Sequence, residues 1–192
     1  FQALTTYAFM FSLITIGITQ LVLTRYVADE YYRGHIGSMT ATFFSATTLH
    51  SLVWGPFVLC FVSGLAVSWS VKLGALILFL AVSGTWIAII FLSAAKDYMR
   101  ISGTFMIGAA ASFGASAFLG ARYGFAGYLN GFALGQSLIF LLLGRAIIKE
   151  FGYREPRNYL WLRYFKRYPY LIGVGLLYNL AIWVDKLVFW AS

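Results

Sequence analysis

The stretch LGALILFLAVSGTWIAIIFLSAA, residues 73–95, contains no Asp, Glu, Lys or Arg. A helix of this length reaches across the hydrocarbon core of a bilayer, which needs about 20 predominantly apolar residues. Largely apolar stretches recur along the rest of the chain, at about residues 1–24, 42–69, 102–121, 125–143 and 168–190. The sequence therefore predicts an all-α integral membrane protein with about six transmembrane helices.

The overall composition supports this prediction. Hydrophobic residues make up 61% of the 192 residues and charged residues only 10%, whereas soluble domains average roughly 45–50% apolar and about 25% charged residues. The net charge of +8 does not indicate nucleic-acid binding, because the basic residues lie mainly in the connections between apolar stretches. The class of soluble proteins is excluded.

The Lys and Arg residues are divided unequally between the two sides of the predicted membrane. Eleven of them follow odd-numbered stretches: Arg25, Arg33, Lys96, Arg100, Arg145, Lys149, Arg154, Arg157, Arg163, Lys166 and Arg167. Only Lys72 and Arg122 follow even-numbered stretches. The positive-inside rule therefore predicts a multi-pass membrane protein with the 145–167 loop in the cytoplasm. Residue 1 then lies at the outer face, so we expect at least one preceding helix in a longer parent protein.

The basic connection before the last apolar stretch allows two interpretations. Residues 145–167 carry seven positive charges and separate five apolar stretches from the sixth. A basic connection of this kind suits a joint between two helical bundles that rests on anionic cytoplasmic lipid. An ordinary loop that sets the topology explains it equally well. Both interpretations place the connection at the inner leaflet.

A polar segment follows the first apolar stretch. In LTRYVADEYYRG, residues 23–34, Arg25, Asp29 and Arg33 recur every four residues and share one face if the segment is helical. Their charges alternate in sign, which favours i,i+4 ion pairs, and Gly34 allows the helix to end. The segment is either a helix extension stabilised by modest ion pairs, or a cytoplasmic gate or head-group contact beside a transport pathway.

Asp185 and Lys186 are the charged residues that lie well inside a predicted span. Charged groups at membrane depth are costly and usually face a cavity or a partner. Neighbouring positions on a helix point about 100° apart, so we do not expect these two side chains to pair with each other. They are candidates for lining a pathway, or for a bridge to a helix outside this chain.

Small and amide residues predict close contacts between helices. Gly127, Gly131 and Gly135 are spaced by four residues and form two overlapping GxxxG patterns, which let helix backbones approach closely. We interpret them as a packing face, with a sliding helix contact as the alternative. The amides of Asn130, Gln136 and Asn179 are expected to form hydrogen bonds between helices rather than to bind substrate.

The sequence offers no arrangement of residues typical of an enzyme. It has no paired-carboxylate motif, His35 and His50 are not spaced as metal ligands, and the Gly-rich stretches lack the lysine and hydroxyl of a phosphate-binding loop. We therefore predict a protein without catalytic residues, cofactor or bound metal.

Two stretches carry a resemblance to a known family. The stretches GITQLVLTRYVADEYYRG, residues 17–34, and YPYLIGVGLLYNLAIWVDK, residues 168–186, resemble the PelG family, membrane transporters of the Pel exopolysaccharide system. That family belongs to the multidrug/oligosaccharidyl-lipid/polysaccharide flippase superfamily. The resemblance implies a parent of about twelve helices in two six-helix lobes around a central cavity, with transport by alternating access.

The resemblance also implies how the chain is divided. Residues 1–148 would be helices two to six of the N-terminal lobe, residues 149–167 the cytoplasmic loop between the lobes, and residues 168–192 the first helix of the C-terminal lobe. The implied partners are a polysaccharide substrate, the lipid bilayer, inner-membrane synthase subunits and a cytoplasmic glycosyltransferase. An exopolysaccharide exporter is thus the leading hypothesis. The alternatives are a flippase for lipid-linked oligosaccharides and a non-transporting membrane scaffold of the synthase.

Overall fold

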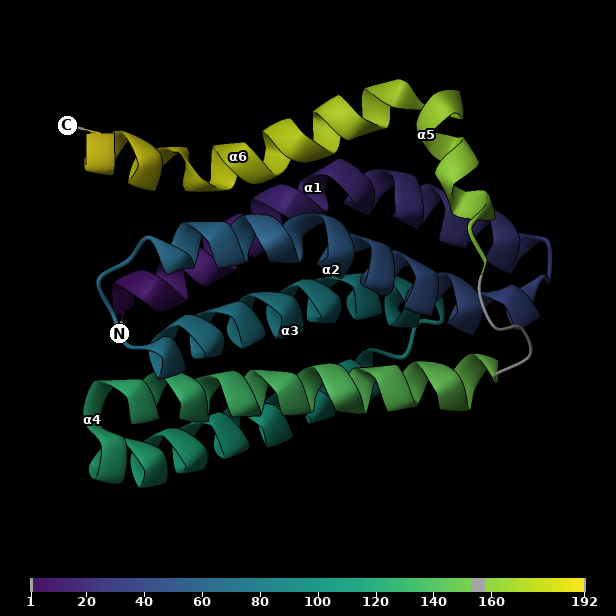
Figure 1. Cartoon of the computed structure of the whole chain (residues 1–192). Coiled ribbons are helices and arrows are strands. Elements are labelled where there is room, and N and C mark those ends of the chain that lie inside the picture. The colour runs from purple at the N-terminus through teal and green to yellow at the C-terminus, as the bar shows by residue number, and fades with distance from the viewer. Residues whose placement is uncertain (1, 153–157, 192) are drawn as a thin grey trace.

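The regular elements of the protein are helices throughout the described part of the chain. The computed structural model describes residues 2–152 and 158–191, and Arg154 and Arg157 of the basic connection lie outside these ranges. Figure 1 shows the elements in order: α1 (Gln2–Tyr32), η1 (Ile36–Ser38), α2 (Met39–Ser63), α3 (Trp69–Ala94), α4 (Tyr98–Phe151), η2 (Leu160–Leu162), α5 (Arg163–Arg167) and α6 (Pro169–Ala191). The predicted all-α membrane fold is confirmed.

Four helical segments are long and apolar enough to cross a membrane. They are Gln2–Tyr32, Ile36–Ser63, Trp69–Ala94 and Tyr98–Phe151. The last is 54 residues long and turns back on itself at Gly124, where φ is 58° and ψ is −134°. A positive φ is readily adopted only by glycine, so Gly124 separates two antiparallel arms (Figure 1). These arms contain the predicted fourth and fifth stretches. The sixth lies in α6, which has 23 residues and is not among the four, so the count of six spans stays a prediction.

Two helices continue beyond their apolar stretches. α1 ends at Tyr32 rather than near Thr24, so the polar segment forms the last turns of this helix. Gly34 then adopts a φ of 76° and turns the chain into the short η1. The second arm of α4 ends at Phe151, and the N–H of Gly152 donates to the carbonyl of Ile148 at 2.9 Å. Helical hydrogen bonding does not require apolar side chains. The length of the apolar stretch therefore underestimates the length of each of these two helices.

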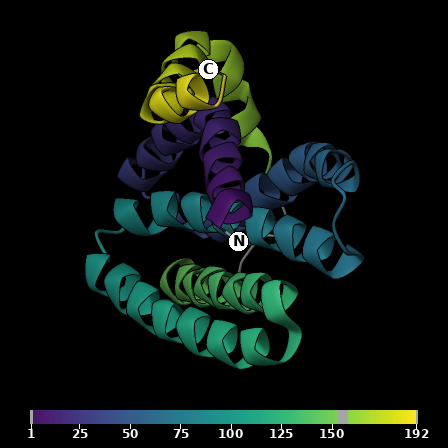
Figure 2. The same ribbon diagram turned by 90° about the vertical axis from the view of Figure 1, so that its left-hand side faces the viewer.

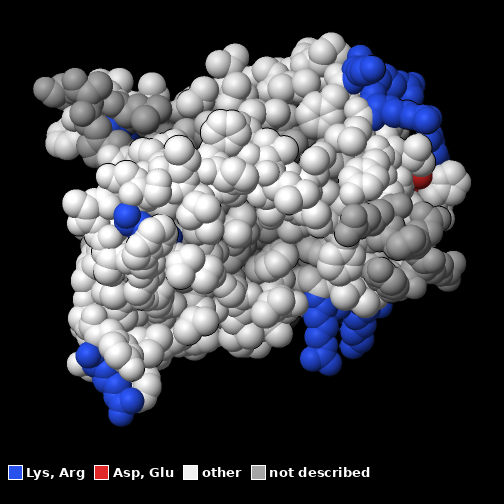
Figure 3. All heavy atoms as spheres, in the orientation of Figure 1, with Lys and Arg blue, Asp and Glu red and all other residues white. Residues whose placement is uncertain are grey.

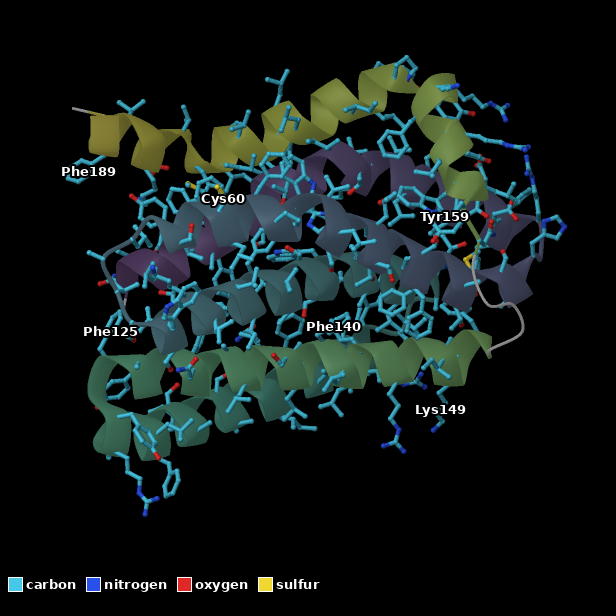
Figure 4. The ribbon with its side chains drawn as sticks, viewed as in Figure 1. Cys60, Phe125, Phe140, Lys149, Tyr159 and Phe189 are labelled. Atoms are coloured by element: carbon cyan, nitrogen blue, oxygen red, sulfur yellow. The ribbon has the colours of Figure 1, made fainter. Side chains whose placement is uncertain are left out.

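α3 is the central helix of the bundle. It packs against α1 on one side, α2 on a second and α4 on a third. Phe79 and Phe91 of α3 are 1% and 0% exposed. Phe140 of α4 points toward α3 (Figure 4), into space that a side chain at Gly84 would fill, since a Cβ there would stand 2.6 Å from the Phe140 ring. The small residue on α3 therefore sets how closely α4 approaches.

α1 and α2 lean away from each other above α3. Both pack against α3 far more than against one another. Viewed from the end of the bundle, the two helices form the arms of a V with α3 at its base (Figure 2). Side chains of α1 and α2 line a groove between the two helices.

α6 lies along the side of α1 that faces away from α4 (Figures 1 and 2). The two backbones meet at Gly17 and Gly175, and a Cβ at Gly17 would stand 2.8 Å from the carbonyl oxygen of Gly175. Beside this crossing, the amide of Asn179 donates to the carbonyl of Leu13 at 2.7 Å and to Oε1 of Gln20 at 3.1 Å. Small residues and a buried amide thus hold α6 to α1, as is common between helices in membranes.

The charged residues on the visible face lie away from its centre. Figure 3 shows Lys and Arg side chains toward the left and right of the view and on its lower edge, and a broad central surface without charged side chains. Such a surface matches the hydrocarbon part of a bilayer.

Candidate functional site

The polar end of α1 forms ion pairs, although not the complete predicted series. Arg25 Nε lies 3.3 Å from Asp29 Oδ1, which confirms the first i,i+4 pair. Arg33 does not continue the series, because its guanidinium lies 3.2 Å from Glu30 Oε1 instead. The Nδ1 of His35 lies 3.1 Å from the other oxygen of Glu30. The helix ends at Tyr32, so Arg33 leaves the face that it would share with Asp29, and the expected Asp29–Arg33 pairing is wrong.

Asp29 has a second partner from a distant part of the chain. The hydroxyl of Tyr164, in α5, donates to Asp29 Oδ2 at 3.1 Å. Burial raises the pKa of the Tyr164 phenol, and its hydrogen bond to the Asp29 carboxylate raises it further. Tyr164 therefore stays a neutral donor, and its ring packs edge-on against Tyr26 with 5.2 Å between the centroids.

The described end of the basic connection, residues 158–168, is bound to both α1 and α2. Asn158 Nδ2 donates to the Tyr26 hydroxyl of α1 at 2.9 Å. Trp161 Nε1 donates to the Ser45 hydroxyl of α2 at 3.1 Å, and this hydroxyl lies 2.5 Å from the carbonyl oxygen of Asn158. Trp161 is only 2% exposed. We call this set of contacts, formed by Tyr26, Asp29, Ser45, Asn158, Trp161 and Tyr164, the connector clasp.

The clasp was not predicted from the sequence. The same segment is rich in Lys and Arg, which suggests a solvated loop, and its described basic residues do stay outside the clasp contacts. The available signal was the apolar and aromatic residues Leu160, Trp161, Leu162, Tyr164 and Phe165 interleaved with these charges. At the opposite border of the connection, Lys149 points away from the bundle (Figure 4).

Asp185 and Lys186 pair with each other, contrary to the prediction. Lys186 Nζ lies 2.8 Å from Asp185 Oδ2, and the two side chains are 51% and 64% exposed. Neighbouring residues point about 100° apart on a helix, but the long, flexible Lys186 side chain curls back far enough to reach the Asp185 carboxylate. Both side chains are exposed on α6, where they are free to contact another helix or to line a cavity.

The three spaced glycines lie where the two arms of α4 meet. A Cβ at Gly131 would stand 2.5 Å from the backbone nitrogen of Ser116, and one at Gly127 would overlap the carbonyl of Leu119. A Cβ at Gly135 would overlap Ser112. These neighbours are mostly backbone atoms, which do not move aside as the end of a side chain does. The glycine face thus fixes the spacing of the hairpin.

Two of the three amides form the expected hydrogen bonds between helices. Asn130 Nδ2 of α4 donates to the Ser70 hydroxyl of α3 at 2.8 Å, and Asn179 joins α6 to α1 as described above. Gln136 lines a hollow between the arms of α4, together with Ser112 and Tyr128.

The groove between α1 and α2 has two parts that share Trp54. The part nearer Gln2 has a volume of about 170 Å³ and is lined by aromatic side chains of both walls, including Tyr7 and Phe11 of α1 and Phe57 and Phe61 of α2. The rings of Phe11 and Phe61 approach to 5.6 Å between centroids, so the two walls touch here. The groove is therefore narrow at the Gln2 end of α1.

The part of the groove nearer the clasp is wider. Its volume is about 360 Å³, and it is lined by Thr19 of α1, His50 and Trp54 of α2, and Trp161 and Phe165 beside the clasp. Its lining also includes Lys166. The larger hollow thus lies nearer the end of the bundle that the sequence places at the cytoplasm.

The comparison with known proteins decides the family. The family model PelG, described as "Putative exopolysaccharide Exporter (EPS-E)", matches residues 1–192. The chain belongs to the PelG family. No curated protein and no solved structure matches it. The resemblance drawn from residues 17–34 and 168–186 is confirmed, and PelG membership with four long apolar helices supports a membrane protein with a role in polysaccharide export, a transport role rather than an enzymatic one.

His50 entered the sequence analysis only as a residue that is not spaced as a metal ligand. It is 5% exposed, its ring stacks on Phe79 of α3 at 6.2 Å between centroids, and neither ring nitrogen has a hydrogen-bond partner within the described residues. A single His in an apolar stretch does not reveal whether it faces a packed core or a groove. The signal lay in the spacing of four between His50 and Trp54, which places them on one side of α2.

Proposed function

We propose that this chain forms part of an inner-membrane exporter that moves exopolysaccharide by alternating access, with the α1–α2 groove as part of the pathway. One observation carries the proposal: the walls of the groove meet at Phe11 and Phe61, whereas a hollow of about 360 Å³ separates them at the other end. A pathway closed at one end and open at the other is what alternating access requires.

The lining of the groove suits a sugar chain. Faces of sugar rings carry C–H groups that pack against the negative faces of aromatic rings, and sugar hydroxyls find polar partners at the edges. The groove combines Tyr7, Phe11, Trp54, Phe57 and Phe61 with hydroxyl groups such as that of Thr15.

The proposed exporter has the two-lobe plan of the superfamily. Residues 1–148 then supply helices two to six of the first lobe, residues 149–167 join the lobes in the cytoplasm, and residues 168–192 begin the second lobe. The basic connection faces anionic lipid and the cytoplasmic glycosyltransferase and synthase subunits that deliver the polymer. In this plan, the gate is formed by the Arg25–Asp29 pair with Arg33, and Asp185 with Lys186 faces the cavity between the lobes.

Cross-linking the closed end of the groove tests the proposed function. The full-length exporter carries Phe11→Cys and Phe61→Cys in a Cys60→Ser background, and an oxidant joins the two new thiols in living cells. We expect oxidation to abolish secretion of the polysaccharide and reduction to restore it, because the walls must separate for the polymer to pass.

The matched control joins two parts that are not proposed to separate. Ser116→Cys and Tyr128→Cys link the arms of α4, where the Ser116 hydroxyl donates to the Tyr128 carbonyl at 3.2 Å. Secretion is expected to continue after this link forms. Undiminished secretion with a complete link between positions 11 and 61 would refute movement of the groove walls.

The proposed orientation has a separate test. Lys72→Cys and Lys149→Cys, each in the Cys60→Ser background, are treated in intact spheroplasts with a maleimide that does not cross membranes. Position 72 should react and position 149 should react only after the membrane is opened. Labelling of both positions from one side would overturn the topology.

A further inference from the structure

Two arginine side chains from distant parts of the chain meet at one aromatic ring. The guanidinium carbon of Arg25, in α1, lies 5.8 Å from the centroid of the Tyr168 ring, and that of Arg167, in α5, lies 5.4 Å from the same centroid. Both distances are within the ~6 Å over which an aromatic ring attracts a cation. The ring thus holds two positive charges near each other, although like charges repel. An anion that reaches both guanidinium groups would offset this repulsion.

Acidic side chains do not neutralise these arginines. Asp29 lies 3.3 Å from Arg25, but it also accepts a hydrogen bond in the connector clasp, and Arg25 remains 55% exposed. In the described chain, no acidic side chain pairs with Arg163 or Arg167. These two residues are exposed and four positions apart, so they lie on one side of α5. Figure 3 shows Lys and Arg side chains gathered at the upper right of the view, where Figure 1 places α5. Unpaired positive charge is therefore available at this corner of the bundle.

The two arginines stand at the start of the predicted sixth span. Tyr168 directly precedes α6, and the α6 side chains of Tyr170, Val174 and Leu177 are 63%, 53% and 66% exposed. Their spacing places these three side chains on one side of the helix, where a bilayer would bring them into contact with acyl chains. Arg25 and Arg167 then lie at the level of the lipid head groups. The predicted orientation makes this the cytoplasmic leaflet, which contains anionic lipid.

We infer that Arg25 and Arg167 bind the phosphate group of an anionic phospholipid of the inner leaflet, with Arg163 beside them on α5. A guanidinium presents a planar fork of N–H donors, which matches the oxygens of a phosphate and forms charge-assisted hydrogen bonds with them. The acyl chains of the lipid then run along α6. This site goes beyond the proposed function, because its ligand is a lipid that is not exported, and it rests on the proposed orientation of the chain.

Lipid binding is measured by native mass spectrometry of the purified full-length protein, titrated in detergent with phosphatidylglycerol or phosphatidylcholine. Both lipids carry a phosphate, but only phosphatidylglycerol has a net negative charge. We expect saturable binding of phosphatidylglycerol by the wild type and about tenfold weaker binding by Arg25→Gln/Arg167→Gln, because charge-assisted hydrogen bonds are lost. Arg167→Gln alone leaves the Arg25–Asp29 pair intact and should also weaken binding.

The matched control removes the same charge from another part of the predicted cytoplasmic end. Arg145 and Lys149 of α4 are exposed and have neither an ion pair nor a ring contact in the part of the chain that the structure describes. Lys149 points away from the bundle (Figure 4). Arg145→Gln/Lys149→Gln should bind phosphatidylglycerol as the wild type does. Equal loss in the two double variants would indicate general attraction between charges and would overturn the site, as would equal binding by all of these proteins.

Two further measurements separate a lipid from a free phosphate, and the lipid site from export. Inorganic phosphate at constant ionic strength should not displace phosphatidylglycerol, because it has no acyl chains to contact α6. Complete displacement would mean a site for the free anion and would refute the lipid assignment. Secretion is measured in cells in parallel. Absence of phosphatidylglycerol binding by the wild type refutes this site alone, whereas secretion by cells that lack the protein refutes the export function.

Discussion

A single methyl group tests whether the glycine face fixes the α4 hairpin. In Gly131→Ala, the new Cβ would stand 2.5 Å from the Ser116 backbone nitrogen and 2.6 Å from backbone atoms of Ala115. Real Cβ atoms do not approach backbone this closely, so the two arms must separate locally. Overpacking of this kind costs about 1–3 kcal/mol.

The same hairpin supplies a matched control. A Cβ at Gly114 would meet no atom within 4 Å, so Gly114→Ala gains the helix propensity of alanine, up to about 1 kcal/mol, without a clash. Gly131→Ala gains the same helix propensity but loses the close packing between the two arms of α4. The difference between the two variants is therefore about 1–3 kcal/mol, in favour of Gly114→Ala.

Thermal unfolding in detergent measures this difference. For a chain of this size, 1 kcal/mol shifts Tm by about 2–4 °C, so Gly131→Ala should unfold roughly 5 °C below Gly114→Ala, read by fluorescence-detected size exclusion. The two variants should express and insert alike. Identical Tm values would show that the arms separate freely, and the glycine face would then have no role in packing.

Three further predictions concern the clasp and α6. Tyr164→Phe should lower the free energy of unfolding by about 1.5 kcal/mol, because it removes the hydrogen bond to Asp29. The pKa of Tyr164 is raised in the folded protein, so the wild type keeps this advantage below about pH 10 and loses it as the pH rises through the raised pKa. Tm values of both proteins measured across this pH range check the prediction. Asn179→Leu should lower Tm by a few degrees by removing two hydrogen bonds between α6 and α1, at about 0.6 kcal/mol each, and an unchanged Tm would contradict the role of this amide. Asp185→Asn should reduce secretion and the paired exchange of Asp185 and Lys186 should restore part of it, since the exchange keeps the ion pair; secretion assays with both variants at equal membrane abundance check this.

The helices could be predicted because lipid imposes a simple rule on them. Backbone groups must be paired inside the bilayer, so an apolar run of sufficient length is a helix almost regardless of its neighbours. The uncharged stretch at 73–95 therefore became α3, and the one at 1–24 became the apolar part of α1. The rule does not mark where a helix ends in the polar region, which is why α1 and α4 continue farther than their apolar residues indicate.

The candidate site was harder to predict because it depends on contacts between distant residues. The Arg25–Asp29 pair is local and follows from spacing alone. The bonds of Tyr164 and Asn158 join positions more than a hundred residues apart, and spacing has no bearing on them. The pairing of Lys186 with Asp185 is also local, but helical spacing alone did not predict it, because spacing takes no account of a flexible Lys side chain that curls back to the carboxylate.

The connector clasp has a mechanical consequence. Its bonds run from one short segment to both walls of the groove, through Tyr164 and Asn158 to α1 and through Trp161 to α2. The segment therefore bridges the two walls at the clasp end of the groove. The walls can move apart there only if the hydrogen bonds from the segment to one of them break. Since α6 begins at Pro169, directly after this segment, and packs along α1, a movement of α1 that breaks the bond to α2 would carry the segment and α6 along together.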